Sequence, residues 1–377
     1  MKFFHLADLH LGKRVHDFSM LEDQEDILRQ ILDLCEKEGP DAVLLAGDIY
    51  DKSTPSAQAV DLLDRFLVDL TQRVDHVFMI PGNHDSPERL AFGSRLMARE
   101  GLHIAPPYQG PQAPYVLEDA HGPLYIHLLP YLRPGMVQAH FPDEDITSYT
   151  QAVGAAIAHL SIDPGKRNLL VAHQFVTGAE RSDSERVIVG GSDNVSASVF
   201  EAFDYVALGH IHGPQNILSS RLRYAGSPLK YSFSEKNQVK SVTVVNLEEK
   251  GTVQVWTLPL IPRHDLREIR GNLDDLLAAA PSSGPEKEDY IRAILTDEET
   301  PPMALAKLRK AYPRIMRLDL DNRRTRHQSF VYDKVREDLS DLDLFSGFYE
   351  SQNGKPLSPD QKAYVEKVFK RIGEEDQ

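Results

Sequence analysis

The chain has 377 residues, of which 41% are hydrophobic and 26% are charged, and this composition is typical of a globular protein with two or three domains. It has no run of roughly 18 apolar residues that could form a membrane helix, and an acidic residue, Asp8, comes before a signal peptide could form, so we expect no membrane contact and a cytoplasmic location. The single cysteine, Cys35, predicts that there is no disulfide framework. The net charge of −15 is unfavourable for a chain that would hold nucleic acid by itself, because Lys and Arg normally supply the phosphate contacts.

Short apolar runs alternate with amphipathic stretches over the first part of the chain. The runs predict buried strands over 2–7, 42–46, 77–80, 124–129, 168–172 and 205–208. Apolar residues recur at helical spacing over 27–35 and over 56–71, which predicts two helices between the first three strands. This alternation of strands and helices predicts an α/β fold in layers.

The pattern changes to strands alone after Arg221. The predicted strands cover 222–225, 239–247 and 253–258, and Pro259 and Pro262 then mark a boundary. A small α+β unit follows, with strands over 266–269, 290–295 and 315–318 and helices over 273–279 and 303–312. The C-terminal tail has two helical patterns and more apolar residues than so short a segment can bury alone. We therefore expect four parts, namely a main domain over 1–262, a cap domain over 263–322, a linker over 323–343 and a helical partner-binding segment over 344–377.

Residue types that bind metals gather at the ends of the predicted strands. In chain order these residues are Asp8, His10, Asp48, Asn83, His84, His173, His210 and His212. Ligands of open α/β sheets bind outside the carboxyl ends of the strands, so side chains that are distant in sequence can converge there. The neighbouring Gly47, Gly82 and Gly209 would allow the backbone to turn sharply.

Two or more carboxylates, four histidines and one amide make a mixed nitrogen and oxygen set that suits two divalent transition metals. A carboxylate such as Asp48 could bridge the two ions. Such a pair of ions polarises a phosphodiester and activates water, while a nearby imidazole protonates the leaving alkoxide. A single His after a strand is usually just a polar loop residue, but five motifs in order, each after an apolar run, are much less easily accidental.

The order Asp-x-His, Gly-Asp, Gly-Asn-His-Asp, a single His and Gly-His-x-His resembles the calcineurin-like metallophosphoesterase superfamily. The resemblance implies a layered β-sandwich flanked by helices and two divalent ions, with Mn²⁺ as the expected metal. It implies that one ion is held by Asp8, His10, Asp48 and His212. It implies that the other is held by Asp48, Asn83, His173 and His210, with Asp48 as the bridge. His84 would be the general acid that contacts the phosphate.

Longer motifs are similar to the SbcD-type nuclease subunits, over 184–195, 203–215, 224–233 and 348–361. This resemblance implies a metal-dependent exonuclease and endonuclease that acts on DNA double-strand ends and hairpins in repair and recombination. It also implies a homodimer of the nuclease subunit within a heterotetramer that contains an SbcC-type, SMC-like ATPase. Such a partner would supply much of the DNA grip that the charge of this chain disfavours. This chain has no P-loop motif of its own.

One position departs from part of the family. Archaeal and eukaryotic relatives carry a His three positions after the bridging aspartate, whereas this chain has Asp51. The role of that His therefore does not transfer, and Asp51 is expected to accept a hydrogen bond.

Two other functions remain open at this stage. The first is a general metallophosphoesterase that acts on nucleotides or other small phosphodiesters, although protein phosphatases are disfavoured because 47–53 lacks their Gly-Asp-x-x-Asp-Arg-Gly pattern. The second is a scaffold that binds DNA ends through a degenerate site, which is disfavoured because a competent residue occupies every ligand position.

Four further features have two interpretations each. His127 is expected to be a core or edge residue of a strand and not a ligand. Asp85 would either orient His84 or cap its loop. The segment 177–193 would either touch substrate or connect strands through solvent. The basic stretch 314–326 would either contact DNA phosphates or form a solvent-facing linker.

Overall fold

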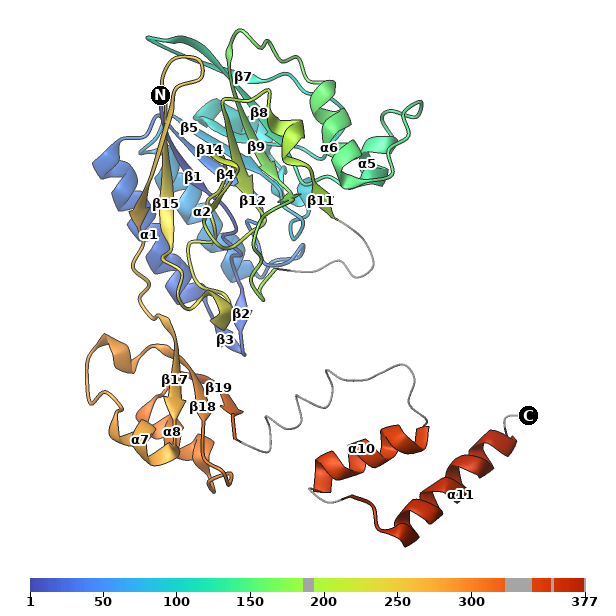
Figure 1. Ribbon diagram of the computed structural model, residues 1–377. Coiled ribbons are helices and arrows are strands. Elements are labelled where there is room, and N and C mark those ends of the chain that lie inside the picture. Colours follow the sequence, from blue (N-terminus) through green and yellow to red (C-terminus); the bar gives the residue numbers. More distant parts are fainter. Residues whose placement is uncertain (186–192, 323–340, 354–355, 376–377) are drawn as a thin grey trace. The chain divides into compact units, whose positions relative to one another are not determined.

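The computed structural model describes residues 1–185, 193–322, 341–353 and 356–375 (Figure 1). The chain divides into two compact units, Met1–Arg267 and Glu268–Gln377. None of the helices in these described ranges combines the length and apolar character needed to cross a bilayer. Most of the expected linker, residues 186–192 of the family motif over 184–195, and the arginines at 323, 324 and 326 lie outside the described residues.

The first unit contains two six-stranded sheets. The order of the first sheet is β16 (Val253–Pro259), β15 (Ser241–Leu247), β1 (Lys2–Leu6), β4 (Ala42–Ala46), β5 (His76–Ile80) and β6 (Leu102–Ile104). The order of the second is β13 (Gln215–Ile217), β14 (Ser219–Tyr224), β12 (Tyr205–Gly209), β9 (Arg167–His173), β8 (Gly122–Leu129) and β7 (Tyr115–Asp119). Strands β1, β4 and β5 are mutually parallel, as are β8, β9 and β12, so their carboxyl ends lie at one edge of each sheet.

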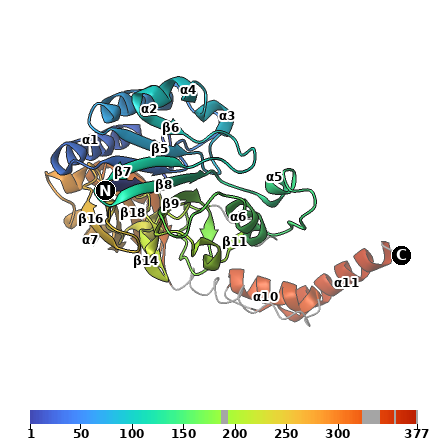
Figure 2. The same cartoon turned by 90° about the horizontal axis from the view of Figure 1, so that it is seen from above.

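The two sheets face each other across an apolar core. Phe3, Phe78, Leu169 and Tyr205, which come from both sheets, are completely buried there. Helices α1 (Leu21–Glu38) and α2 (Ala57–Thr71) cover the outer side of the first sheet, and α5 (Pro134–Gln138) and α6 (Tyr149–Ala158) lie on the side of the second (Figure 2). The first unit is therefore the expected β-sandwich flanked by helices.

Local sequence signals account for the helix boundaries. The Ser56 hydroxyl accepts the backbone N–H of Ala59 at the start of α2. A capping box between Ser148 and Gln151 begins α6. Helix α1 ends at Gly39, whose φ of 56° suits a residue without a side chain. These capping residues determine where each helix begins or ends, beyond the apolar positions from which it was predicted.

Every strand predicted for the first unit is present, whereas three edge strands were not predicted. In β7 half-buried and exposed positions alternate, and no residue is buried. Strands β6 and β13 have only three residues each. Short, half-exposed edge strands carry little of the apolar signal on which sequence analysis depends. Short elements complete the unit, namely β2 (Arg14–Val15), β3 (Phe18–Ser19), α3 (Pro87–Leu90), α4 (Ser94–Met97), β10 (Phe175–Val176) and β11 (Asn194–Val195).

The second unit begins with a three-stranded sheet in the order β17 (Leu266–Gly271), β18 (Tyr290–Leu295) and β19 (Ile315–Leu320). Helices α7 (Leu273–Ala278) and α8 (Ala304–Ala311) pack on it through a small apolar core that includes Leu276, Ile291 and Leu308. Helices α10 (Asp341–Asn353) and α11 (Pro359–Glu375) form a pair in which the rings of Phe345 and Phe369 lie 6.1 Å apart.

Candidate metal centre

The residues expected to form the site all lie at or just after the carboxyl ends of parallel strands. Asp8 and His10 follow β1, Asp48 follows β4, Asn83 and His84 follow β5, His173 ends β9, and His210 and His212 follow β12. The structure brings all eight together, although they are spread over most of the first unit. The two carboxylates and four histidines of the expected ligand set are buried, none being more than 7% exposed.

The backbone is strained where it presents these side chains. Eight non-glycine residues of the described chain have a positive φ, and four of them are Asp8 at 55°, His10 at 44°, Asp48 at 49° and His210 at 105°. This conformation is unfavourable for L-residues and persists only where the surrounding structure holds it. Half of the strained non-glycine residues of the described chain therefore belong to this one cluster of candidate site residues.

The glycines beside the site have different roles from one another. Gly47 has a φ of 86° and turns the chain as expected. Gly209 has no positive φ, but a Cβ atom there would lie 1.8 Å from the carbonyl oxygen of Ala46 and 2.7 Å from Nδ1 of His173. Gly209 is thus required because the two sheets approach each other closely at the site, and this could not be read from the sequence.

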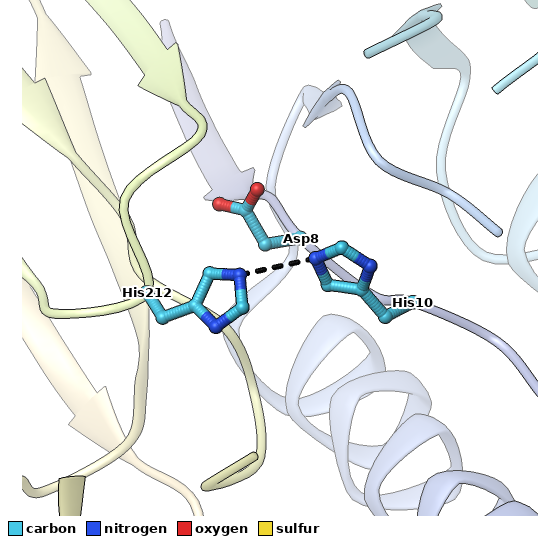
Figure 3. Close-up of side chains that lie close together, drawn as sticks. All are labelled: Asp8, His10 and His212. Atoms are coloured by element: carbon cyan, nitrogen blue, oxygen red, sulfur yellow. Dashed lines mark hydrogen bonds between the residues drawn. The ribbon is translucent and has the colours of Figure 1, made fainter. Parts of the chain in front are cut away.

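One group of donor atoms comes from β1, β4 and β12. Nε2 of His10 lies 3.1 Å from Nε2 of His212, with Asp8 beside them (Figure 3). The same nitrogen of His10 lies 3.6 Å from Oδ2 of Asp48. The ring nitrogens and carboxylate oxygens thus converge on one point.

A second group meets on the other side of Asp48. Oδ1 of Asn83 lies 3.1 Å from Nε2 of His173 and 2.9 Å from Nδ1 of His210. Nε2 of His173 lies 3.5 Å from Oδ2 of Asp48. The same carboxylate oxygen therefore faces both groups, which is the position of a bridging ligand.

The hydrogen bonds show that these atoms suit a cation. Nδ1 of His173 lies 2.8 Å from the carbonyl oxygen of Ala46, which can only accept a proton, so this nitrogen is the donor. When the ring is neutral, Nε2 therefore presents a lone pair to the oxygens of Asn83 and Asp48. Lone pairs directed at one another with no proton between them are stabilised by a divalent ion, and this mixture of N and O donors suits a transition metal.

Without an ion, protons balance the charge of the cluster. Burial raises the pKa of Asp8 to about 7. Burial opposes the charging of His173, but the neighbouring Asp48 carboxylate outweighs it and raises the pKa of His173 to about 9. Metal binding displaces such protons, so the affinity for metal rises with pH.

His84 occupies a different place from the expected ligands. Its Nδ1 donates to the carbonyl oxygen of Asp51 at 2.8 Å, and its backbone N–H donates to Oδ1 of Asp48 at 2.9 Å. Nε2 is 4.0 Å from Oδ2 of Asp48. The ring is thus held from behind, and its second nitrogen is directed at the cluster, where a substrate phosphate could meet it.

Asp85 and Asp51 have structural partners. The Asp85 carboxylate accepts the backbone N–H groups of Ile49, Tyr50 and Gly82 at 2.9–3.0 Å, so it caps the loop and ties it to the loop after β4. Of the two roles expected for Asp85, the contacts of its carboxylate correspond to capping of the loop. Asp51 accepts a hydrogen bond from Lys13 Nζ at 2.8 Å, as expected for a residue in place of the missing His.

The segment 177–193 contributes residues that sequence analysis did not single out. Glu185 accepts the backbone N–H of His212 at 2.7 Å, and Oγ of Ser184 lies 2.7 Å from Nδ1 of that ring. The described part of this segment therefore supports a site residue. Its only signal in the sequence was its place in a family motif.

His127 lies apart from the site. It is buried in β8, its Nε2 lies 3.2 Å from Oδ1 of Asn168, and its ring packs edge-on against Phe203. It is an interior residue with a hydrogen-bond partner, like many neutral histidines.

The two facing sheets and the metal-type residues at their edge are typical of a phosphoesterase. Comparisons with known proteins support this class. Residues 1–214 match the family model described as calcineurin-like phosphoesterase, and residues 262–353 match the one described as type 5 capsule protein repressor C-terminal domain. The chain is 34% identical to the SbcD subunit of the nuclease SbcCD from Staphylococcus epidermidis over 99% of each chain. It is 32% identical to the subunit of the same name from Staphylococcus saprophyticus, over 100% of this chain and 99% of the relative. The chain therefore belongs to the calcineurin-like phosphoesterases, and among them to the SbcD family of metal-dependent nuclease subunits.

Proposed function

We propose that this chain hydrolyses phosphodiester bonds of DNA at double-strand ends and hairpins, using two divalent ions that are Mn²⁺ in the cell. The single observation that carries the two-ion proposal is the Oδ2 atom of Asp48. It faces His10 on one side and His173 on the other, at 3.6 and 3.5 Å. The proposed ligands are Asp8, His10, Asp48 and His212 for one ion, and Asp48, Asn83, His173 and His210 for the other. DNA as substrate follows from the full-length similarity to nuclease subunits.

Different residues of the chain have different roles in the proposed hydrolysis. Bound divalent ions supply positive charge that polarises the phosphate and lowers the pKa of water. Because Nδ1 of His84 donates to the carbonyl oxygen of Asp51, only Nε2 faces the site, and the ring protonated on both nitrogens gives its Nε2 proton to the departing alkoxide. Asp85 keeps the two loops that carry Asp48 and His84 in register, so the proton and the phosphate meet in a fixed geometry.

Replacing His84 with Gln is expected to lower the rate of DNA hydrolysis by about 10²–10⁴-fold, the usual contribution of a general acid. The two ions should remain bound, because His84 is not among the proposed ligands. The measurement is nucleotide release from linear double-stranded DNA with and without Mn²⁺, beside calorimetric counting of bound Mn²⁺. His127→Gln, the same substitution at a buried position outside the site, is the control and should keep the wild-type rate. A His84→Gln rate equal to that of wild type would eliminate the general-acid role.

A small phosphodiester is the alternative substrate. The same site would hydrolyse bis-p-nitrophenyl phosphate. Activity on this compound without DNA cleavage would therefore have two explanations: the nuclease needs a partner that is missing from the assay, or the chain is a general phosphodiesterase. Adding an SbcC-type ATPase distinguishes them, since only the nuclease would then cut DNA.

The helix pair α10–α11 is our candidate for docking on that SMC-like ATPase, within a heterotetramer. Large apolar side chains on the pair are exposed to solvent, with Phe348 at 52% and Tyr364 at 70%. Such a surface fits an apolar groove of a partner. Deleting the residues after Leu344 is expected to abolish co-purification with the ATPase while leaving Mn²⁺-dependent hydrolysis of bis-p-nitrophenyl phosphate intact. A truncated chain that still co-purifies would place the docking surface elsewhere.

A homodimer of the nuclease subunit is the other proposed contact. In the first unit Phe92 and Leu96, beside α3 and on α4, are 83% and 69% exposed. Apolar side chains of this size, exposed together, are typical of an interaction surface. The double variant Phe92→Asp and Leu96→Asp is expected to sediment as a monomer at a concentration at which wild type is dimeric. Leu218→Asp, at an equally exposed position outside α3 and α4, is the control. A dimeric double variant would exclude this surface.

A further inference from the structure

The two histidines that face each other in Figure 3 are each supported from behind by a carboxylate paired with a lysine. Behind His212, Ser184 Oγ donates to Oε1 of Glu235 at 2.5 Å, and its only proton is used there. The contact of 2.7 Å between Ser184 Oγ and Nδ1 of His212 must then be donated by the ring. Nδ1 therefore carries the proton, and the lone pair of Nε2 points at His10.

Glu235 is held in turn by Lys240. Nζ of Lys240 donates to Oε2 of Glu235 at 2.6 Å and to the backbone oxygen of His212 at 2.8 Å. Glu235 is completely buried and Lys240 is 4% exposed. Burying an ion pair costs desolvation energy that the attraction often only balances. A buried pair placed directly behind a metal-ligand histidine is therefore better explained by what it does for that histidine than by stability.

A second pair lies behind His10. Oδ1 of Asp51 is 3.7 Å from Nδ1 of His10, an electrostatic contact that is too long for a hydrogen bond, and it accepts from Nζ of Lys13 at 2.8 Å. His10 Nδ1 is buried and has no hydrogen-bond partner among the described residues. If Nε2 of His10 binds an ion, its Nδ1 must carry the proton, and the Asp51 carboxylate stabilises that arrangement.

The histidines on the other side of Asp48 have no carboxylate of this kind behind them among the residues that the structure describes. Nδ1 of His173 donates to the neutral carbonyl of Ala46. Nε2 of His210 is buried without a hydrogen-bond partner in the same described part of the chain. The two ion positions thus differ in the charge behind their imidazoles, although their donor types are similar.

We infer that Glu235, acting through Ser184, and Asp51 are positioning residues that make the Asp8–His10–Asp48–His212 position bind its ion more tightly than the other position. The inference rests on the two-ion site of the proposed function. A carboxylate behind a ligand histidine fixes its tautomer and orientation and raises its basicity, and losing such a partner commonly costs 10–100-fold in metal affinity. Lys240 and Lys13 hold the two carboxylates in place through hydrogen bonds.

The test is titration of the metal-free full chain with MnCl₂ by isothermal calorimetry. Wild type is expected to show a tighter and a weaker binding step. Glu235→Gln, Asp51→Asn and Ser184→Ala should each weaken the tighter step by about 10–100-fold and leave the weaker step unchanged. Ser184→Ala keeps the buried ion pair, so it reports on the relay even if Glu235→Gln destabilises the fold. Asp204→Asn, at another buried carboxylate paired with a lysine, Lys250, is the matched control and should change neither step.

Thermal unfolding provides a second readout. The gain in Tm on adding Mn²⁺ depends on affinity, so it should shrink in the three variants, whereas a purely structural role would lower the metal-free Tm and leave the gain unchanged. Equal weakening of both steps, or of neither, in Ser184→Ala and Asp51→Asn would overturn the inference while leaving the two-ion site in place. A wild-type chain that binds no Mn²⁺ would instead overturn the proposed function.

Discussion

Replacing Asp48 with Asn is expected to remove the high-affinity binding of both ions and to abolish DNA hydrolysis. Oδ2 of Asp48 is a carboxylate oxygen that lies within 3.6 Å of a histidine from each donor group of the site. Asn keeps the shape and one oxygen but not the negative charge that offsets the repulsion between two cations. Because loss of a residue behind a ligand already costs about 10–100-fold, loss of the shared ligand should exceed about 100-fold for both positions.

The measurement is calorimetric titration with MnCl₂ together with nucleotide release from linear double-stranded DNA. Asp204→Asn provides the same chemical change at a buried carboxylate whose partners are Asn168, Lys250 and Gly251, and it should behave as wild type in both assays. If Asp48→Asn lost one ion and kept the other at wild-type affinity, Asp48 would be a ligand of a single ion. The bridging role would then have to be abandoned.

The effect of Asp48 on its neighbours gives a further reason to expect a large response. Burial raises the pKa of Asp85 to about 6, and the Asp48 charge adds to this shift. Three acidic side chains are thus concentrated where water is excluded, and protons or metal ions must compensate them. The candidate site thus combines a strained backbone with closely spaced buried carboxylates, and such features generally cost stability.

The sequence predicts the central strands and the convergence of the candidate site residues well, because each depends on short-range patterns. A buried parallel strand needs a continuous apolar run, and Ala42–Ala46 is such a run. Residues placed directly after these strands must lie at one edge of the sheet, wherever the connecting helices run. Hence Asp8 and His210 could be placed in one site without any knowledge of loop conformation.

The features that the sequence does not predict depend on contacts between distant segments, and such contacts leave no periodic pattern in the sequence. Lys240 lies at the start of an expected strand and reads as an ordinary surface lysine, yet it is buried against Glu235. Gly209 is needed because Ala46 of the other sheet lies against it. The choice between the two roles of Asp85 also depended on where the loop after β4 lies. Such features follow from the packing of the two sheets against each other. This packing depends on many residues of the sequence together and not on any single short pattern.

His5 illustrates the same limit, and it is expected to contribute to the acid sensitivity of the first unit. It is completely buried between the sheets, where its Nε2 lies 3.1 Å from the carbonyl oxygen of Leu208 and its Nδ1 lies 2.9 Å from the hydroxyl of Tyr205. The carbonyl can only accept, so Nε2 carries the single proton and Nδ1 accepts from Tyr205. The neutral ring is fully satisfied, and a second proton would leave Tyr205 without an acceptor.

Burial, assisted by the nearby Arg223, lowers the pKa of His5 from 6.5 to about 3. Above pH 6.5 the ring is neutral in both the folded and the unfolded chain, so its contribution to stability does not change with pH. Between pH 6.5 and about 3 only the unfolded chain takes up the proton, so the free energy of unfolding falls as the pH falls. At about 1.36 kcal/mol per pKa unit, the loss over this range approaches about 5 kcal/mol.

The variant His5→Gln separates this contribution from that of the other titrating groups. Gln retains a donor near the position of Nε2 but does not titrate, so we expect it to be about 1–2 kcal/mol less stable than wild type at pH 8. Its free energy of unfolding should then fall less steeply below pH 6.5, so that the difference narrows and reverses toward pH 4. Urea unfolding of the metal-free proteins between pH 4 and 8 measures both curves. Curves that stay parallel over this range would show that His5 is protonated in the folded protein, contrary to the hydrogen-bond geometry.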